Sequence, residues 1–324
     1  MPCSHLPPAD AVAFDPAWRT ETVLALARGI AADVALDRLP ILADALEDAG
    51  CDNFALLNHL RHEPNHRVEC WALRRVLRTT LMLPGGVEMA FAYCPPGSFL
   101  MGSPESETER SDEELQHEVR LTKGFSCGVY PVTQAQWRAV MGTDPSHFKG
   151  DDLPVVQVSW DDAQAFCSQV RELTGTAVRL PTEAEWEYAC RGGTTTPFYW
   201  GAELNGTQAN CDGTDPYGTE TAGPPYREGT SSVGSYAEGF PHAWGLADVH
   251  GNVWEWCEDW YDAGYYARSP VVDPACRDCE QMYRVLRGGA WDFNPGSCRA
   301  ACRNGNVPGA RYNSYGFRVV FCLD

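Results

Sequence analysis

Two acidic residues flank a glycine turn in the segment DVHGNVWEW at residues 248–256. Asp248 and Glu255 could converge with the backbone carbonyl groups of Gly251 and Val253 on one cation. Carboxylates combined with backbone oxygens are the ligands that Ca²⁺ prefers in proteins. The segment therefore predicts a calcium site at Asp248, Gly251, Val253 and Glu255, and the alternative is a hydrogen-bonded loop without a cation.

The chain contains 14 cysteines, scattered from Cys3 to Cys322. Only Cys276 and Cys279 form a C-x-x-C pair, and no second pair follows at the spacing of a zinc site. We expect most of the cysteines to be small buried apolar residues. A local disulfide and a metal site both stay open for the Cys276–Cys279 pair.

Acidic residues outnumber basic ones, with 44 Asp and Glu against 25 Lys and Arg, and the formal net charge is −19. This balance argues against a nucleic-acid partner, which requires a basic surface for its phosphates, and against docking on anionic lipid. No segment approaches the length of a membrane span, and the N-terminus lacks the basic start of a secretory signal. These features predict a protein of a bacterial-type cytoplasm without a membrane partner.

The elements that must position these residues change in character near residue 85. Residues 17–80 read as helical because apolar residues recur every three or four positions. One helix is expected to be capped by Asp52, and another spans Trp71 to Leu77. The sequence LPGG at 83–86 breaks this pattern. We therefore predict a helical module over residues 1–85, which binds another protein or self-associates, and a second domain over 86–324.

The second domain is rich in glycine, proline and tryptophan, and helical periodicity mostly disappears. Helices are expected over 133–141, 161–173 and 182–190, the first with a capping box between Thr133 and Gln136. Short strands are expected over 88–94, 119–121 and 316–321. Residues 192–241 have almost no regular pattern, so this long loop needs anchors, which tryptophan side chains or a metal could provide.

Several segments of the second domain are too particular to arise by chance. Their order and spacing resemble the formylglycine-generating (sulfatase-modifying) enzyme family over residues 87–322. The resemblance implies an α+β protein with the C-type-lectin-like fold of that family, in which a small antiparallel sheet supports long loops held by aromatic residues. Calcium-binding members use positions that match the four residues named above. The segments are PGSFLMGS at 96–103, PVT at 131–133, PVVQVSW at 154–160, RLPTEAEWE at 179–187, DVHGNVWEW at 248–256, RGGAW at 287–291 and GFR at 316–318.

The resemblance also implies where catalysis would take place. The oxidases of this family use two cysteines after a Gly-Gly-Ser element to bind copper, and a thiolate pair suits Cu(I). In this chain Ala290 replaces the serine, Phe293 stands at the first cysteine position, and Cys298 is the candidate for the second. We therefore expect no copper and no oxidase activity. An oxidoreductase of the formylglycine-generating type, acting on a thiol substrate, is the alternative.

A related class, the ergothioneine-type sulfoxide synthases, adds an iron-binding helical bundle with an H-x3-H-x-E motif. His62 and His66 have the H-x3-H spacing, but Glu69 comes one residue too late. The helical region is also too short for that bundle. We therefore interpret this stretch as a solvated turn around Pro64.

Residues 291–318 resemble the variable region of target proteins of diversity-generating retroelements, which often use this same fold. In those proteins mutation of template adenines randomises Asn codons, which cannot then become Gln, Lys, Glu, Met or Trp. None of these five residue types occurs between 292 and 315. The residues that match the unvaried framework are Trp291, Pro295, Cys298, Arg299, Arg303, Pro308, Arg311, Gly316, Phe317 and Arg318.

The residues between these framework positions form the predicted ligand-binding set, and they are expected to bind a protein. They are rich in Tyr, Ser, Gly and Asn, as antibody loops are, with Phe293, Tyr312 and Tyr315 as anchors. The set consists of Asp292, Phe293, Asn294, Gly296, Ser297, Asn304, Asn306, Val307, Gly309, Ala310, Tyr312, Asn313, Ser314 and Tyr315.

Four framework arginines are expected to hold these loops by pairing with carboxylates, namely Arg299, Arg303, Arg311 and Arg318. An ordinary, non-diversified member of the same family is the alternative, in which these loops simply line a pocket.

Overall fold

A computed structural model covers the chain and describes residues 14–64, 66, 70–277 and 281–322. The chain divides into two compact units, Met1–Thr79 and Thr80–Asp324. The division lies slightly before the predicted boundary at residue 85, because the strand that begins at Thr79 pairs with the following strand of the second unit. Among the described residues, no helix combines the length and the apolar character that crossing a membrane requires.

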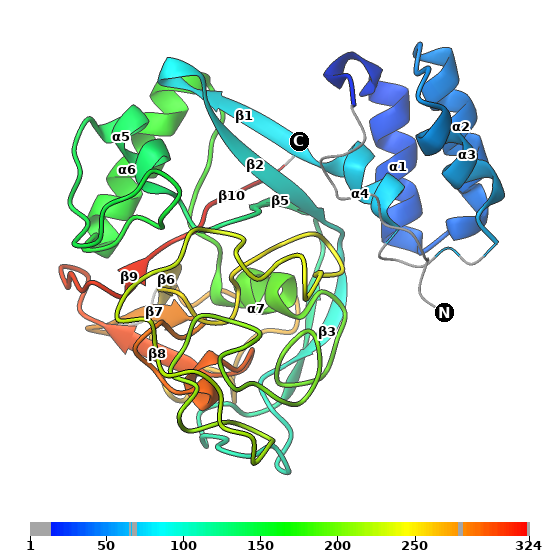
Figure 1. Cartoon of the computed structure of the whole chain (residues 1–324). Coiled ribbons are helices and arrows are strands. Elements are labelled where there is room, and N and C mark those ends of the chain that lie inside the picture. Colours follow the sequence, from blue (N-terminus) through cyan, green and yellow to red (C-terminus); the bar gives the residue numbers. More distant parts are fainter. Residues whose placement is uncertain (1–13, 65, 67–69, 278–280, 323–324) are drawn as a thin grey trace. The chain divides into compact units, whose positions relative to one another are not determined.

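The first unit consists of short helices (Figure 1). The helix predicted over Trp71–Leu77 is confirmed. Asn53, rather than Asp52, caps the preceding helix, because its side-chain oxygen accepts the hydrogen bond from the Leu56 N–H. The elements are η1 (Pro16–Trp18), α1 (Glu21–Asp33), η2 (Leu36–Arg38), α2 (Leu39–Asp48), α3 (Phe54–His62) and α4 (Trp71–Leu77).

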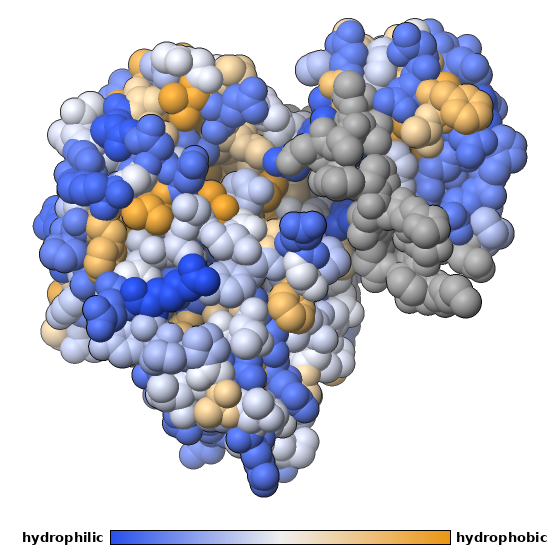
Figure 2. Space-filling view, viewed as in Figure 1, coloured by the Kyte–Doolittle hydropathy of each residue, from blue (hydrophilic) through white to orange (hydrophobic). Residues whose placement is uncertain are grey.

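Some apolar side chains of the first unit stay exposed, among them Val34, Ile41 and Phe54. Figure 2 shows an apolar group, surrounded by hydrophilic side chains, on the face that carries α2 and α3. Exposed apolar groups can mark interaction surfaces when they are large and contiguous. The role of this unit in binding another protein or in self-association stays a prediction.

Small sheets form the framework of the second unit (Figure 1). One sheet has the strand order β1-β2-β5-β10, another pairs β3 with β4, and a further sheet has the order β8-β7-β6-β9. In the last sheet β7 runs antiparallel to both of its neighbours, whereas β9 runs parallel to β6. The strands are β1 (Thr79–Leu83), β2 (Val87–Cys94), β3 (Gly97–Met101), β4 (His117–Leu121), β5 (Phe125–Gly128), β6 (Trp254–Trp260), β7 (Arg284–Arg287), β8 (Arg303–Asn306), β9 (Tyr315–Gly316) and β10 (Val320–Cys322), with the 3-10 turns η3 (Pro84–Gly86) and η4 (Pro295–Cys298).

All three helices predicted for the second unit are confirmed. They are α5 (Gln134–Met141), α6 (Trp160–Thr174) and α7 (Glu183–Arg191). Each begins with a capping box, whose N-cap residues are Thr133, Ser159 and Thr182. Each ends at a glycine with a left-handed backbone, which L-residues with a Cβ rarely adopt.

The strand predictions are confirmed in part. Residues 88–94 lie in β2 and 119–121 lie in β4. The single strand predicted over 316–321 is instead split into β9 and β10. The residues between these strands bond to other segments, because the Val132 N–H donates to the Phe317 carbonyl and the Gly128 N–H donates to the Val319 carbonyl, each at 2.8 Å.

The long segment between α7 and β6 contains no helix or strand in the described part of the chain, as predicted. One anchor of this segment is the buried amide of Asn252. The side-chain oxygen of Asn252 accepts from the Ser231 N–H at 2.9 Å and from the Asn210 amide at 3.2 Å, and its Nδ2 donates to the Ser231 carbonyl at 3.1 Å. One amide thus fixes two distant points of the loop.

Candidate functional site

Buried arginines pair with carboxylates from distant segments of the second unit. The guanidinium of Arg299 binds both carboxylate oxygens of Glu114 at 2.8 Å and one oxygen of Glu107 at 2.7 Å. Glu107 and Glu114 lie on the connection between β3 and β4, whereas Arg299 follows η4, and Arg299 and Glu114 are almost fully buried. A two-point contact between planar groups fixes their orientation as well as their distance.

Two further framework arginines make the same kind of pair. Arg303 binds Glu183 at 2.7 and 2.9 Å, and Arg318 binds Glu255 at 2.6 and 2.7 Å. Burial alone would raise the pKa of Glu183, but the charges of Arg303 and Arg287 outweigh it and lower that pKa. The predicted role of Arg299, Arg303 and Arg318 in holding the loops is therefore confirmed.

Arg311 differs from the other framework arginines. It binds Asp162 at the start of α6 at 2.7 and 2.9 Å, as predicted, but the pair lies at the surface. Surface pairs contribute little to stability. Arg311 therefore orients its loop without making it depend on a buried charge.

The predicted ligand-binding residues differ in their exposure. Four of them are exposed: Asp292, Val307, Gly309 and Tyr312. Seven are half-buried: Phe293, Asn294, Ser297, Asn304, Asn306, Ala310 and Asn313. Three are buried and are corrections to the predicted surface: Gly296, Ser314 and Tyr315.

The three predicted aromatic anchors have different environments. Tyr312 is 52% exposed, whereas Tyr315 is only 7% exposed and meets Trp256 edge-to-face at 5.5 Å between ring centroids. The ring centroids of Tyr315 and Tyr312 lie 4.9 Å apart, so the buried ring of Tyr315 packs against the exposed ring of Tyr312. Phe293 packs edge-to-face on Trp254 at 5.4 Å. Tyr312 is thus the one predicted anchor with an exposed ring.

The residues of the predicted calcium site are engaged in other contacts. The carboxylate of Glu255 accepts from Arg318 and also from the Trp186 ring N–H at 2.6 Å. The Gly251 carbonyl accepts from the Val253 N–H at 2.9 Å. Glu255 therefore belongs to the arginine framework, and Ca²⁺ binding at Asp248, Gly251, Val253 and Glu255 stays a prediction.

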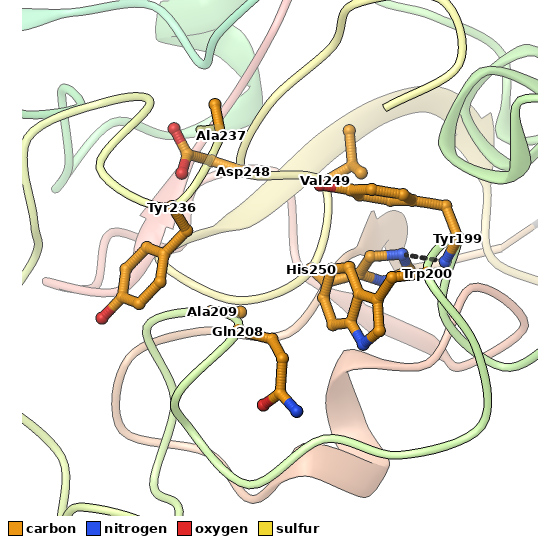
Figure 3. A pocket seen from close by; sticks show the side chains of 9 residues that line it. All are labelled: Tyr199, Trp200, Gln208, Ala209, Tyr236, Ala237, Asp248, Val249 and His250. Carbon is orange, nitrogen blue, oxygen red and sulfur yellow. Dashed lines mark hydrogen bonds between the residues drawn. The ribbon is translucent and has the colours of Figure 1, made fainter. Parts of the chain in front are cut away.

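Asp248 lines a small cavity together with residues of the long loop (Figure 3). One of its oxygens accepts from the Gly234 N–H at 2.6 Å. Burial raises the pKa of Asp248 to about 6, although the charge of Arg318 opposes this shift. None of the fourteen predicted ligand-binding residues lines this cavity, whose residues are Tyr199, Trp200, Gln208, Ala209, Tyr236, Ala237, Asp248, Val249 and His250.

His250 in the cavity wall serves to connect segments. Burial lowers its pKa to about 3, so the ring is neutral at pH 7. Its Nδ1 lies 2.7 Å from the Cys298 carbonyl, and its Nε2 lies 3.2 Å from the Tyr199 N–H. Only the tautomer with a proton on Nδ1 satisfies both contacts. Both nitrogens are then occupied, and His250 ties the long loop to η4.

The thiols near the family's catalytic position are buried. Hydrogen bonding with Cys211, together with burial, raises the pKa of Cys298 well above its ordinary value, so its sulfur carries a proton at pH 7. Cys211 was not identified from the sequence, because it lies in the long loop and reaches Cys298 only through the fold. Cys276 forms a disulfide, and Cys279 lies outside the described residues.

Residues 87–322 match the family described as the sulfatase-modifying factor enzyme 1-like domain. The formylglycine-generating enzyme of Streptomyces coelicolor is 40% identical over 197 residues, which are 58% of this chain and 59% of that protein. The match therefore spans less than two-thirds of that relative's length.

Two solved structures resemble the second unit. PvdO from Pseudomonas aeruginosa has a TM-score of 0.63 and 27% identity, and the match covers 76% of this chain and 98% of that one. Treponema denticola variable protein 1 has a TM-score of 0.61 and 24% identity over 76% of this chain and 99% of that one. The likeness to the variable protein shows the fold alone. With the family match, these findings confirm the predicted α+β, C-type-lectin-like fold.

Asp248 provides a test through its ionisation. Its folded pKa of about 6 lies above the unfolded value of about 3.9, so the protein loses stability as pH rises through that interval. Asn would keep an acceptor for the Gly234 N–H and tolerates the left-handed backbone at this position. In EDTA at pH 7.5 we expect Asp248→Asn to increase the free energy of unfolding by about 1–2 kcal/mol, and to match the parent near pH 4. An equal or lower Tm at pH 7.5 would contradict this.

The same variant tests the calcium prediction. Added Ca²⁺ should raise the Tm of the parent according to RT ln(1 + [L]/Kd), more at pH 7.5 than at pH 5, where Asp248 is protonated. Asp248→Asn should lose this shift, and Asp292→Asn, a change of an exposed acid outside the predicted site, should keep it. An identical shift in Asp248→Asn and the parent excludes the site.

Proposed function

This chain belongs to the sulfatase-modifying factor enzyme 1-like family, and from this premise we propose that it is a non-catalytic member that binds a protein through its C-terminal loops. The observation that carries the proposal is the difference in burial, within residues 291–318, between the framework positions and the predicted ligand-binding positions. The framework arginines Arg299, Arg303 and Arg318 are buried in ion pairs, whereas Asp292, Val307 and Tyr312 between them are exposed.

Hydrogen bonds from neighbouring segments hold the backbone of the C-terminal loops in place, and a fixed backbone suits a binding surface. The Tyr312 carbonyl accepts from the Gln157 N–H, and the Pro308 carbonyl accepts from the Trp160 N–H, each at 2.9 Å. The Trp291 ring N–H donates to the Asn313 carbonyl at 3.2 Å. A fixed backbone that carries short, variable side chains loses little entropy on binding, as in matured antibody loops.

The charge of the loops favours a protein partner over other classes. Arg311 and Asp292 are the exposed charged residues between 291 and 318, and the chain as a whole is strongly acidic. A nucleic acid would find no basic surface to offset its phosphates. Tyr312, flanked by Arg311 and Asn313, is an exposed aromatic residue of the kind that is typical of a protein-binding hot spot.

We further propose that this surface is the variable region of a diversity-generating retroelement target protein. The residue types between the framework positions support the proposal, because all fourteen are accessible from a randomised Asn codon. Their exposure adds support, since eleven of the fourteen have at least part of their side chain or Cα at the surface. Substitution there leaves the buried ion pairs intact.

The alternative, an oxidoreductase of the formylglycine-generating type, has one supporting observation. Cys211 lies beside Cys298 and supplies a second thiol that the sequence pattern did not place there. Both residues are buried, however, and they pack with Phe198 and Tyr217 in an apolar cluster. A thiol substrate would reach this pair only after the long loop opened.

Tyr312→Ser should weaken binding of the partner by about 2 kcal/mol or more, the loss expected when an aromatic anchor is removed. The matched control is Tyr283→Ser, because Tyr283 is 44% exposed and lies outside the loops. A proteome display screen against the immobilised protein would find the partner, and titration would compare the variants. Equal affinities for Tyr312→Ser, Tyr283→Ser and the parent would contradict the proposed surface.

Arg299→Gln should instead destabilise the fold. It leaves the buried carboxylates of Glu107 and Glu114 without their cation, a change that costs about 3–5 kcal/mol in other proteins. Urea unfolding monitored by tryptophan fluorescence measures this loss. Arg311→Gln is the matched control and should change the free energy of unfolding by less than about 1 kcal/mol. Similar losses in both variants would contradict the distinction between buried and surface arginines.

Sequencing this gene from many related isolates tests the retroelement proposal. We expect substitutions to concentrate at the eleven surface positions, to fall in the first two codon bases, and to spare Arg299, Arg303 and Arg318. A near-repeat of the gene's 3′ end should lie beside a reverse transcriptase gene. Variation spread evenly over residues 86–324, or the lack of such a repeat, would contradict the proposal.

A further inference from the structure

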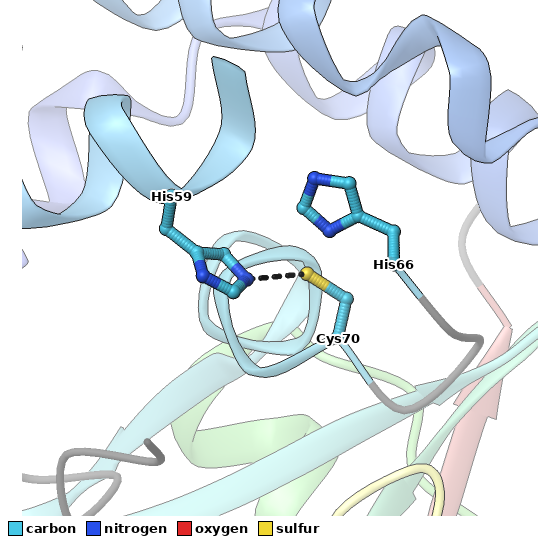
Figure 4. A group of neighbouring side chains, drawn as sticks. All are labelled: His59, His66 and Cys70. Atoms are coloured by element: carbon cyan, nitrogen blue, oxygen red, sulfur yellow. Dashed lines mark hydrogen bonds between the residues drawn. The ribbon is translucent and has the colours of Figure 1, made fainter. Parts of the chain in front are cut away.

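Three side chains of metal-binding types converge in the first unit. His59 lies on α3, Cys70 caps the start of α4, and His66 lies on the connection between these helices. Figure 4 shows the two imidazole rings and the thiol pointing toward one another. Their ligand atoms all lie within 4.8 Å of one another, and the His59 Nε2 is 3.4 Å from the Cys70 sulfur.

These distances are close to those of a tetrahedral zinc centre. Zn–S bonds of about 2.3 Å and Zn–N bonds of about 2.0–2.1 Å place neighbouring ligand atoms about 3.5 Å apart. The spacing between His59 and Cys70 already has this value. His66 would have to approach by about 1 Å, which a small side-chain rotation provides.

The burial and hydrogen bonding of the two imidazoles are compatible with metal binding. Both histidines are half-buried, and a neutral imidazole offers one ring nitrogen with a lone pair to a cation. Neither ring nitrogen of His66 meets hydrogen-bond geometry with a described residue, although the Leu60 backbone acts to raise the pKa of the ring. A buried polar ring of this kind calls for an explanation.

The apolar side of the cluster is also in place. The ring of Trp71 lies 4.9 Å from that of His59, and the Cys70 thiol is fully buried. An apolar shell around ligands limits access of water and strengthens the bond between a cation and a thiolate.

We propose that His59, His66 and Cys70 bind one Zn²⁺ ion. Two imidazoles and one thiolate form a common zinc ligand set, and three protein ligands leave a fourth position open. Glu63 does not belong to the group whose ligand atoms lie within 4.8 Å of one another, so the described residues leave the fourth position open. The site follows the spacing H-x6-H-x3-C, which no part of the sequence interpretation used.

The proposed site differs from the interpretation of this stretch as a solvated turn: Pro64 is exposed, but His66 is half-buried. The H-x3-H pair that suggested iron does not come together, because His62 is exposed and its Nδ1 lies 3.3 Å from the Asn58 carbonyl. The imidazole beside His66 is that of His59, which precedes His62 by one turn of α3, and the two ring centroids lie 5.1 Å apart. His59 is half-buried beside Cys70, whereas His62 at the last position of α3 is exposed.

A zinc ion here would act as a clamp. It would join α3, α4 and the connection between them in a unit built from short helices, where a metal commonly supplements a small apolar core. Because binding is specific to the folded unit, the ion would stabilise it by RT ln(1 + [L]/Kd).

The test uses the full chain, first stripped of metal with EDTA. Zn²⁺ is titrated against a chromophoric chelator, and Co²⁺ serves as a spectroscopic probe. We expect one Zn²⁺ per chain, and a Co²⁺ complex with four-coordinate visible bands and a near-ultraviolet thiolate band. Cys70→Ser should lose the thiolate band, and His59→Gln and His66→Gln should weaken Zn²⁺ binding by about tenfold or more.

Matched controls are available for each ligand type. His62→Gln changes an exposed histidine on the same helix, and Cys322→Ser changes an exposed thiol of the second unit, so both should bind like the parent. Glu63→Gln is a further control, because its carboxylate lies outside the cluster and the change should leave the visible bands as in the parent. Far-ultraviolet circular dichroism of each metal-free variant verifies folding.

Two results would overturn the proposal. One is a failure of the parent chain to bind Zn²⁺ stoichiometrically at micromolar concentration, which requires no variant at all. The other is a thiolate band that persists in Cys70→Ser, or a loss of affinity in His62→Gln equal to that in His66→Gln. Neither result bears on binding through residues 292–313, which lie in the other unit.

Discussion

The buried pair between Arg318 and Glu255 is the interaction on which the second unit depends most. Glu255 lies in β6, and both of its carboxylate oxygens bind the Arg318 guanidinium. The same guanidinium donates to the Gly128 carbonyl at the end of β5 and to the Ala247 carbonyl at 3.0 Å each. One side chain thus joins two sheets and the long loop. Removal of either charge would leave its partner buried and without an opposite charge, which strongly destabilises a fold because the remaining ion is not solvated.

The other arginines extend this arrangement. Glu183 and Glu187 lie one helical turn apart on α7, and they receive Arg303 and Arg287 from β8 and β7. The C-terminal segment is therefore attached to the core at fixed points, and the exposed side chains between these points take no part in the attachment. Exposed positions such as Val307 and Tyr312 can differ without any change in the charges beneath them. The fold separates the residues that maintain its shape from those that contact the surroundings.

Local signals in the sequence predicted what local interactions determine. The caps of α5 and α7 are complete within four residues, so Thr133, Gln136 and Thr182 suffice to place them. Strand β6 was not predicted as a strand, because almost all of its side chains are buried and the usual alternation is absent. Arg318 was expected to pair with a carboxylate, but Glu255 was not identified as its partner, because the two residues lie far apart in the sequence. His59 and Cys70 were likewise invisible as a pair until α3 and α4 were placed. In each case the missing information was a contact between distant residues.

The position of Arg318 and β10 has a consequence for how the protein is made. Strand β10 completes the sheet of β1, β2 and β5, and Arg318 neutralises Glu255, yet both come after every other element of the unit. A ribosome must therefore release residues up to 322 before the core can close. Until then β5 has an unpaired edge, and Glu255 of β6 lacks its partner Arg318. During synthesis the incomplete unit exposes surface that favours aggregation. The segment proposed to vary most is thus synthesised just before the residues that complete the fold, so every sequence variant passes through the same late closing step.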